Sequence, residues 1–199
     1  MPRQTWARLL KVRYRPLRFD RRAGVVRRIG SPRERHLLPE EPTVRALTPE
    51  ETRNERVIRT LYSLAEAKSK DTPKFVSMFA DGGYFNDEAA GQKYYGNDIG
   101  YTVDVYATAF PDMHRELYKM YFMDDVVVVQ LSLNGTHKGD LVLPAGTIPP
   151  TGKEMHTPCC DVFHVNTDGK VVSFDCYVAV PILLQQIGVF MNLQAAFRR

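Results

Sequence analysis

The first sustained hydrophobic pattern of the chain begins after residue 48, where apolar positions recur every three or four residues. This spacing gathers them on one face of a helix. Thr48 and Glu51 form a capping-box pattern around Pro49, which suits the first helical position. We therefore predict a helix from residue 48 to about residue 70, with a buried face that contains Val57, Ile58, Leu61, Leu64 and Ala65.

Two further helices are predicted before most of the strands. The segment 71–73 repeats the start signal, ahead of a short helix that includes Phe75 and Phe79. The segment 97–110 has helical character up to Pro111, although Gly100 lies within it and disfavours a helix.

Beyond Pro111, runs rich in β-branched and aromatic residues are typical of strands. They cover residues 117–122, 126–133, 155–165 and 171–180, and a shorter strand is expected at Tyr84 and Phe85. Helices come first and strands later, without alternation of single strands and helices. This order predicts an α+β fold with a mainly antiparallel sheet.

The turn-forming residues 166–169 are predicted to join the last two strands as a hairpin. Pairing Val165 with Lys170 sets its register. One face then carries the opposed pairs Phe163 with Val172, Asp161 with Phe174, and Cys159 with Cys176. A carboxylate among apolar neighbours has a raised pKa, so Asp161 is the predicted acid or base of a pocket on this face.

Two alternatives for this hairpin stay open. In a packed core, Asp161 would accept only structural hydrogen bonds, and the thiols of Cys159 and Cys176 would act as small hydrophobic groups. A register shifted by one residue would exchange the two faces. Asp175, His156 and His164 would then point inward.

The net charge of +4 is unevenly distributed along the chain. Residues 1–46 carry 13 Lys and Arg against 4 Asp and Glu, whereas the rest carries 14 against 19. We predict an Arg-rich, flexible extension at 1–46, with a targeting or membrane-surface role as the alternative, and one folded domain at 47–199. Because the domain itself is acidic, nucleic acid is not an expected partner. No apolar run is long enough for a membrane span.

Three cysteines, Cys159, Cys160 and Cys176, form neither a disulfide framework nor a CxxC pair. The histidines show no spacing with them that suits zinc. We therefore expect a reducing compartment, the cytoplasm, and no metal site.

Short motifs follow the predicted elements in a fixed order. They are Phe110-Pro111-Asp112, Gly135-Thr136-His137 with Gly139, Pro149-Pro150-Thr151-Gly152, Asp161-Val162-Phe163, Asp168-Gly169-Lys170 and Leu183-Leu184-Gln185-Gln186-Ile187-Gly188-Val189. In this order, residues 50–190 resemble the SnoaL-like polyketide cyclase and ester cyclase family of the nuclear transport factor two-like superfamily. The loop 141–147 reads as an insertion relative to that family.

The resemblance implies a cone-shaped, curved antiparallel sheet closed by the N-terminal helices, which is the cystatin-like α+β roll. It implies an apolar pocket inside the cone, a homodimer formed through the outer face of the sheet, and no cofactor. Cyclases of the family use an Asp of the last strand as general acid and base, and that Asp falls at Cys176 here. The assisting polar pair falls at Cys159 and Asp161, and an Asn of the first strand falls at Asn86.

We therefore expect the working carboxylate at Asp161, with Asn86, His137, Cys159 and Cys176 as substrate-binding residues. The predicted function is cofactor-free acid/base catalysis, of the cyclase, isomerase or hydrolase type, on a small apolar carbonyl, ester or polyketide-like molecule. Because Cys176 replaces the usual acid, the alternative is a non-catalytic module of the same fold that binds a small molecule or a protein.

Overall fold

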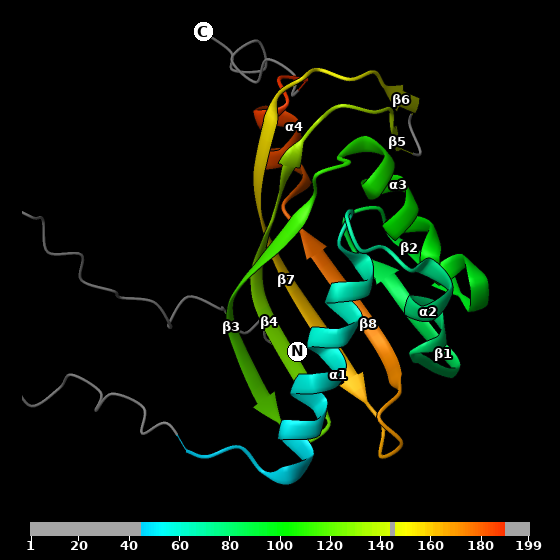
Figure 1. Ribbon diagram of the computed structural model, residues 1–199, viewed down its shortest axis with the longest axis vertical. Helices are drawn as coiled ribbons and strands as arrows, with labels where there is room; N and C mark the ends of the chain where they lie inside the picture. Colours follow the sequence, from blue (N-terminus) through cyan, green and yellow to red (C-terminus); the bar gives the residue numbers. More distant parts are fainter. Residues whose placement is uncertain (1–44, 144–145, 190–199) are drawn as a thin grey trace, which may run out of the picture. The chain divides into compact units, whose positions relative to one another are not determined.

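The computed structural model describes residues 45–143 and 146–189 of the 199-residue chain. The predicted extension at 1–46 lies outside these residues except for Arg45 and Ala46. From Ala46 onward, the described residues belong to one compact unit (Figure 1). In this described part of the chain, no helix is both long and apolar enough to cross a membrane.

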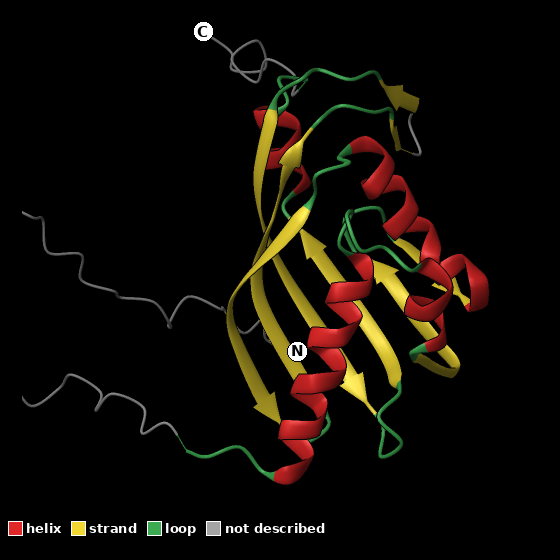
Figure 2. Ribbon diagram, in the orientation of Figure 1, coloured by secondary structure: helices red, strands yellow, loops and turns green. Residues whose placement is uncertain are grey.

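The unit is built on a curved, open sheet of six strands (Figure 2). In chain order the strands are β1 Phe79–Asp87, β2 Gln92–Tyr95, β3 His114–Met123, β4 Val126–Thr136, β7 Glu154–Val165 and β8 Val171–Val178. They lie side by side in the order β2-β1-β8-β7-β4-β3, and only β1 and β8 run parallel. The predicted α+β class with a curved, mainly antiparallel sheet is confirmed.

Helices lie on one side of the sheet, as Figures 1 and 2 show. The helical elements are α1 Pro49–Ala65, α2 Thr72–Ser77, the 3-10 turn η2 Gly96–Gly100, α3 Tyr101–Ala109 and, after the last strand, α4 Val180–Gln186. Ile58 and Leu61 of α1 are fully buried in the same hydrophobic cluster as Val127 of β4 and Phe163 of β7. The core therefore lies between the helices and the sheet.

Helix α1 begins where the sequence predicts and ends earlier. The Glu51 N–H donates to the Thr48 hydroxyl at 3.1 Å, and the Glu51 carboxylate accepts from the Thr48 N–H at 2.9 Å, which completes the capping box. At the other end Glu66 leaves the helix with extended backbone, and its carboxylate accepts from the Arg115 N–H at 3.1 Å. The Ala65 carbonyl also accepts from the Arg115 guanidinium at 2.9 Å. These bonds tie the chain to β3 and stop the helix before residue 70.

The single helix predicted at 97–110 is divided into η2 and α3. Gly100 stands at the division, where a Cβ would lie only 2.4 Å from the Cγ2 of Thr72 in α2. This close approach leaves no room for a side chain, so a glycine stands where the two helical segments meet.

The β7–β8 hairpin has a different register from the predicted one. Asn166, and not Val165, bonds with Lys170 across the turn, through its backbone N–H at 2.9 Å. Gly169, at φ +74°, takes the left-handed position that such a turn requires. A bulge next to Val165 then leaves Val172 41% exposed, although it was predicted to face inward. The observed pairs are Phe163 with Phe174, Asp161 with Cys176, and Cys159 with Val178.

The predicted register is thus wrong by two residues over most of the hairpin, and a shift of two keeps Cys159, Asp161 and Cys176 on their predicted face. Asp161, Cys159 and Cys176 are buried on the helix side of the sheet. His156 and His164 are exposed on β7, and the alternation of the strand places them on the opposite face together with Asp175. The alternative that turned these three residues inward is excluded.

Some short elements have no counterpart in the prediction. The strand β2 and helix α4 were not expected. The predicted insertion at 141–147 coincides with β5 Leu141–Leu143 and most of β6 Gly146–Ile148, which pair as a small separate sheet. Strand β5 contacts α3, so the insertion extends one wall of the unit.

Candidate active site

A small cavity of about 40 Å³ lies between the sheet and the helices. This inner cavity has room for a few water molecules or for the reactive end of a ligand. Its walls are mostly apolar and aromatic. The lining residues are Tyr62, Ala65, Phe75, Phe85, Asp87, Thr102, Val103, Tyr106, Arg115, Leu133, Cys159, Asp161, Phe174, Cys176 and Val178.

Asp161 is the carboxylate buried in the wall of this cavity, with only 2% of its surface exposed. The Tyr62 hydroxyl of α1 donates to its Oδ2 at 2.7 Å, and the Cys159 thiol donates to its Oδ1 at 3.1 Å. Both donors and the acceptor are buried. The strand β7 therefore presents Asp161 to the cavity, and α1 holds it from the other side.

Burial raises the pKa of Asp161 above its ordinary value of 3.8, because desolvation disfavours the charged carboxylate. The hydrogen bonds from Tyr62, Cys159 and Cys176 act in the opposite direction, as does the positive charge of Arg115. The raised pKa brings the proton of Asp161 closer to the neutral range, where a carboxyl group can act as acid or base.

Tyr62 and Arg115 extend the polar side of the site. Burial, together with the neighbouring charge of Asp161, raises the pKa of Tyr62 well above 10.0, so its hydroxyl stays protonated and donates. The Arg115 guanidinium lies 5.8 Å from the centre of the Tyr62 ring and forms an ion pair with Glu66 at 3.4 Å. A fixed positive charge therefore lies close to the Asp161 carboxyl.

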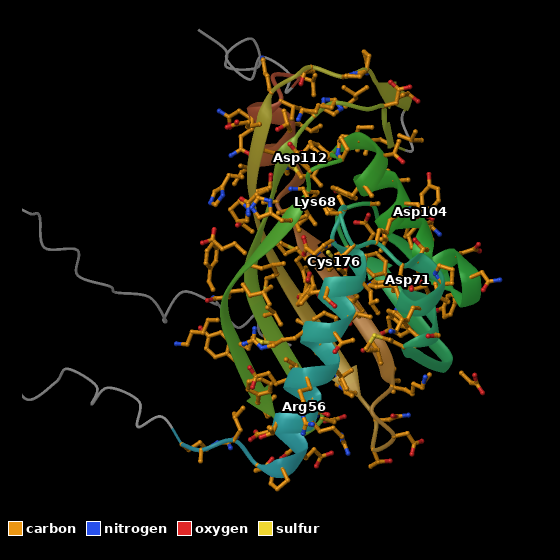
Figure 3. All side chains as sticks on the ribbon, viewed as in Figure 1. Arg56, Lys68, Asp71, Asp104, Asp112 and Cys176 are labelled. Carbon is orange, nitrogen blue, oxygen red and sulfur yellow. The ribbon has the colours of Figure 1, made fainter. Side chains whose placement is uncertain are left out.

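Two thiols complete the site. The Sγ atoms of Cys159 and Cys176 lie 3.8 Å apart. Cys176 lies on β8 between the sheet and the helices (Figure 3). The hydrogen bond with Cys159 and burial raise its pKa well above 9.0. For Cys159 the bond from Cys176 lowers the pKa, but burial and the charge of Asp161 outweigh it, and the pKa is raised. Both thiols are therefore protonated at neutral pH and are poor nucleophiles.

A larger outer cavity, of about 510 Å³, adjoins the inner one. Asp87, Thr102 and Tyr106 line both cavities, so they mark the junction. Burial raises the pKa of Asp87. The rest of the outer cavity comes from β2, α3, the β5 strand of the insertion and the start of α4. A volume of this size is in the range of small-molecule sites, of roughly 300–1,000 Å³.

Asn86, predicted to bind substrate, lies away from both cavities. It neighbours Asp175 in the parallel β1–β8 pair, and its amide donates to the Asp175 carboxylate at 3.0 Å and to Glu88 at 2.6 Å. Because Asp175 belongs to the outer face of β8, Asn86 belongs to that face too. Asn86 therefore joins β1 to β8 on the outer face, and its substrate-binding role stays a prediction.

His137 also lies outside the cavity linings. It is fully buried and packs against Phe110, with ring centres 5.2 Å apart. The Thr151 N–H donates to its Nδ1 at 3.3 Å, whereas its Nε2 has no partner among the described residues. Burial lowers its pKa, so the ring is neutral. His137 therefore holds the 149–152 segment against β4, and its substrate-binding role stays a prediction.

Sequence reasoning missed three residues of the site, namely Tyr62, Arg115 and Asp87. A signal existed for Tyr62, which lies four residues after Ile58 and one turn along the same helix face. The sequence offered no comparable signal for Arg115 or Asp87, because their positions depend on how β3 and β1 pack against the helices.

Comparison with known proteins adds evidence of common descent. The SnoaL-like domain profile matches residues 58–174. No curated protein matches the chain. Among solved structures, a candidate SnoaL-like polyketide cyclase from Jannaschia sp. CCS1 aligns with a TM-score of 0.62 and 19% identity, over 72% of this chain and 96% of that one.

Two further solved structures have the same fold. IdmH, a candidate polyketide cyclase from Streptomyces antibioticus, aligns with a TM-score of 0.57 and 19% identity, over 68% of this chain and 99% of that one. A Catenulispora acidiphila protein with a ketosteroid isomerase-like fold, in complex with trimethylamine, aligns with a TM-score of 0.55 and 19% identity, over 72% of this chain and 95% of that one. At such identities the likeness is one of fold, whereas the domain profile covers more than half of the sequence. The chain belongs to the SnoaL-like domain family.

Proposed function

We propose that this chain is a cofactor-free acid/base enzyme that acts on a small apolar carbonyl, ester or polyketide-like molecule. One observation carries the proposal: a buried Asp161 carboxyl with a raised pKa, bonded to the Tyr62 hydroxyl, in the wall of an apolar cavity. A titratable carboxyl in a concave, mostly apolar site is the kind of group that transfers protons near neutral pH.

In the proposed reaction, ionised Asp161 removes a proton from the carbon next to a substrate carbonyl and later returns it to carbon or oxygen. The Tyr62 hydroxyl keeps the carboxyl oriented, since it donates to Oδ2. Arg115 supplies positive charge near the point where negative charge develops on the enolate oxygen. Phe85, Phe174 and Leu133 exclude water from the reacting atoms.

The two adjoining cavities support a division of roles for the substrate. The inner cavity, about 40 Å³, admits only the reactive end of a molecule. The outer cavity, about 510 Å³, has the size to hold an apolar body. The ring stack of Tyr94 and Tyr101, with centres 5.7 Å apart, lies in the wall of the outer cavity. An extended molecule with a terminal carbonyl fits this arrangement.

The family resemblance also supports Asp161 as the working carboxylate, although Asp161 lies on a different strand from the acid that the family uses. Where the family resemblance expects an acidic residue, the chain has Cys176, and Asp161 is its direct partner across the β7–β8 pair. A carboxyl from the neighbouring strand thus reaches the place of the missing one. Two of the similar solved structures are candidate polyketide cyclases, which fits the proposed substrate class.

The proposal is tested with hydrogen–deuterium exchange at the central carbon of acetylacetone, followed by NMR in D2O with the chelator-treated full chain. This small diketone carries an acidic C–H next to carbonyl groups. Asp161→Asn is expected to lower the enzyme-dependent exchange rate by about 100-fold or more, the usual contribution of a general base.

The matched control is Asp175→Asn, which makes the same change on the outer face of the hairpin and is expected to keep the wild-type rate. Equal exchange rates for wild type and Asp161→Asn would contradict the proposal. Binding of acetylacetone without exchange, seen as a shift of cavity side-chain signals, would instead support the non-catalytic binding module.

A homodimer formed through the outer face of the sheet, and a cytoplasmic location, also belong to the proposal. The first rests on the family resemblance and on exposed aromatic side chains of the outer face, such as Tyr121 at 43% and Tyr177 at 49% exposure. The second rests on the cysteine usage of the chain.

A further inference from the structure

Three groups that can bind a metal converge in the inner cavity. The ligand atoms of Cys159, Asp161 and Cys176 all lie within 4.8 Å of one another, and the three residues are buried. Cys159 and Asp161 are two positions apart on β7, so they share a face, and Cys176 is the cross-strand partner of Asp161. The hairpin pattern predicted that these three side chains share a face, but their spacing along the chain does not match a zinc motif, so no metal site was expected.

The distance between the sulfur atoms suits one shared ion. Two thiolates that bind zinc at about 2.3 Å with tetrahedral angles have sulfur atoms about 3.8 Å apart. The Sγ atoms of Cys159 and Cys176 are 3.8 Å apart. The Cys159 Sγ and Asp161 Oδ1 atoms are 3.1 Å apart, and tetrahedral zinc would need about 3.5 Å. A small rotation of the Asp161 carboxylate would lengthen this distance to the required value.

The same positions are poorly suited to a disulfide. Asp161 is the direct partner of Cys176, and Cys159 pairs with Val178, so the two cysteines are diagonal neighbours across the strands. Diagonal residues of an antiparallel pair are about 7–8 Å apart, whereas a disulfide usually needs Cα atoms within about 6.8 Å. A disulfide would therefore require the strands to move closer together, whereas an ion bound between the sulfur atoms would not.

We propose that Cys159, Cys176 and Asp161 bind one thiophilic divalent cation of the Zn²⁺ type, with a fourth position that faces the inner cavity. Two sulfur ligands select soft or borderline ions over Mg²⁺ or Ca²⁺. Arg115 lines the same cavity and offsets part of the negative charge that three deprotonated ligands carry. Binding replaces the proton on Asp161, so the ion inhibits any proton transfer by that residue.

The test is a titration of the reduced, chelator-treated full chain with Cd²⁺ alone, with no substrate present. The readouts are the ultraviolet absorption of cadmium–thiolate bonds and the stoichiometry from calorimetry. Wild type is expected to bind one Cd²⁺ per chain with this absorption. Cys159→Ser and Cys176→Ser are each expected to weaken binding by more than about 100-fold, since even indirect partners of metal ligands contribute 10–100-fold.

Cys160→Ser is the matched control, because Cys160 lies between the two β7 ligands in sequence but on the opposite face of the strand. It is expected to bind Cd²⁺ like wild type. Absence of the thiolate absorption in wild type, or its equal loss in Cys160→Ser, would overturn the proposal. Circular dichroism checks that each serine variant is folded, and Asp161→Asn, which keeps both thiols, provides a second ligand variant with an expected tenfold or greater loss.

This inference stands apart from the proposed acid/base function. The cadmium titration contains no substrate, and the exchange assay contains a chelator. The metal-site proposal can therefore be contradicted while the acid/base proposal is supported, and the reverse.

Discussion

Asp161 is a residue whose burial is costly when it carries charge. A carboxylate taken out of water is destabilising unless it is protonated or bonded, and Tyr62 and Cys159 donate to separate oxygens of Asp161. Desolvation is nevertheless the larger effect, and it raises the pKa. The buried charged form of Asp161 therefore destabilises the fold, and the same burial makes its carboxyl available as an acid.

The first prediction concerns the stability of Asp161→Asn. Because the pKa of Asp161 is raised in the folded state, its contribution to stability is fully present below the unfolded value of 3.8 and is lost as the pH rises through the folded value. The uncharged Asn does not suffer this loss. We expect the free energy of unfolding of the variant, relative to wild type, to rise as the pH increases above 3.8, as urea unfolding would measure.

Asp175→Asn, which removes a carboxylate from the outer face of the same hairpin, is the matched control. A stability difference between Asp161→Asn and wild type that stays constant over this pH range would mean that Asp161 ionises freely in the folded protein.

At the residue scale, the sequence correctly predicted which face of a strand a side chain lies on, because this depends only on alternation along the strand. The period of β7 placed Asp161 and Cys159 on one face, and that face is the buried one. The resemblance gave positions for Asn86 and His137 but not their surroundings, and both lie outside the cavities. Tyr62 and Arg115 come from other elements, so pairing within one hairpin could not reveal them.

At the scale of elements, one family motif has a structural role. Asp112 follows α3, and its carboxylate accepts from the Thr136 N–H at 2.7 Å and from the Thr136 hydroxyl at 2.8 Å. The backbone bond from Thr136 is the largest influence that lowers the pKa of Asp112, to about 2. The motif therefore joins the end of α3 to the end of β4, next to the walls of the site.

The second prediction is that Asp112→Ala lowers the free energy of unfolding by about 1–3 kcal/mol at neutral pH, the cost of losing hydrogen bonds to a charged group. Since the folded pKa is depressed, this stabilisation is present above 3.8 and is lost as the pH falls toward about 2. Chemical unfolding of wild type and variant at several pH values measures it.

Asp140→Ala removes a carboxylate from a nearby exposed position and is the control. If the difference in free energy of unfolding between wild type and Asp112→Ala stays the same in strong acid, the assigned role of the Asp112 carboxylate is contradicted.

Element boundaries show why part of the fold was not predictable from sequence. The start of α1 is a local signal, the capping box, and it is present as predicted. The end of α1 depends on Arg115 of β3, and the division of η2 from α3 depends on Thr72 packing against Gly100. These contacts join residues that are distant in the chain, so no local pattern contains them.

At the scale of the whole molecule, the sheet has one face covered by helices and one with exposed aromatic side chains. The third prediction is that two chains pair through this outer face, which the resemblance implies. Tyr177→Lys and Tyr121→Lys are expected to shift the protein to the monomer in sedimentation equilibrium, because a charge in the centre of an apolar interface is costly.

Tyr101→Lys makes the same change at a tyrosine of similar exposure, 48%, on the helix side of the sheet, and is expected to leave the dimer intact. A wild-type protein that sediments as a monomer at high concentration would contradict the pairing.

The central claim is that Asp161 is a desolvated carboxyl ready for proton transfer, and its pKa tests this most directly. The measurement is a carbon-detected NMR titration of the full chain, with Asp161→Asn to assign the signal. Tyr62→Phe, which removes a donor to the carboxylate, is expected to raise the pKa further. We expect the wild-type pKa to lie clearly above 3.8, whereas a value at or below 3.8 would mean a solvated or purely structural carboxylate and would contradict the account.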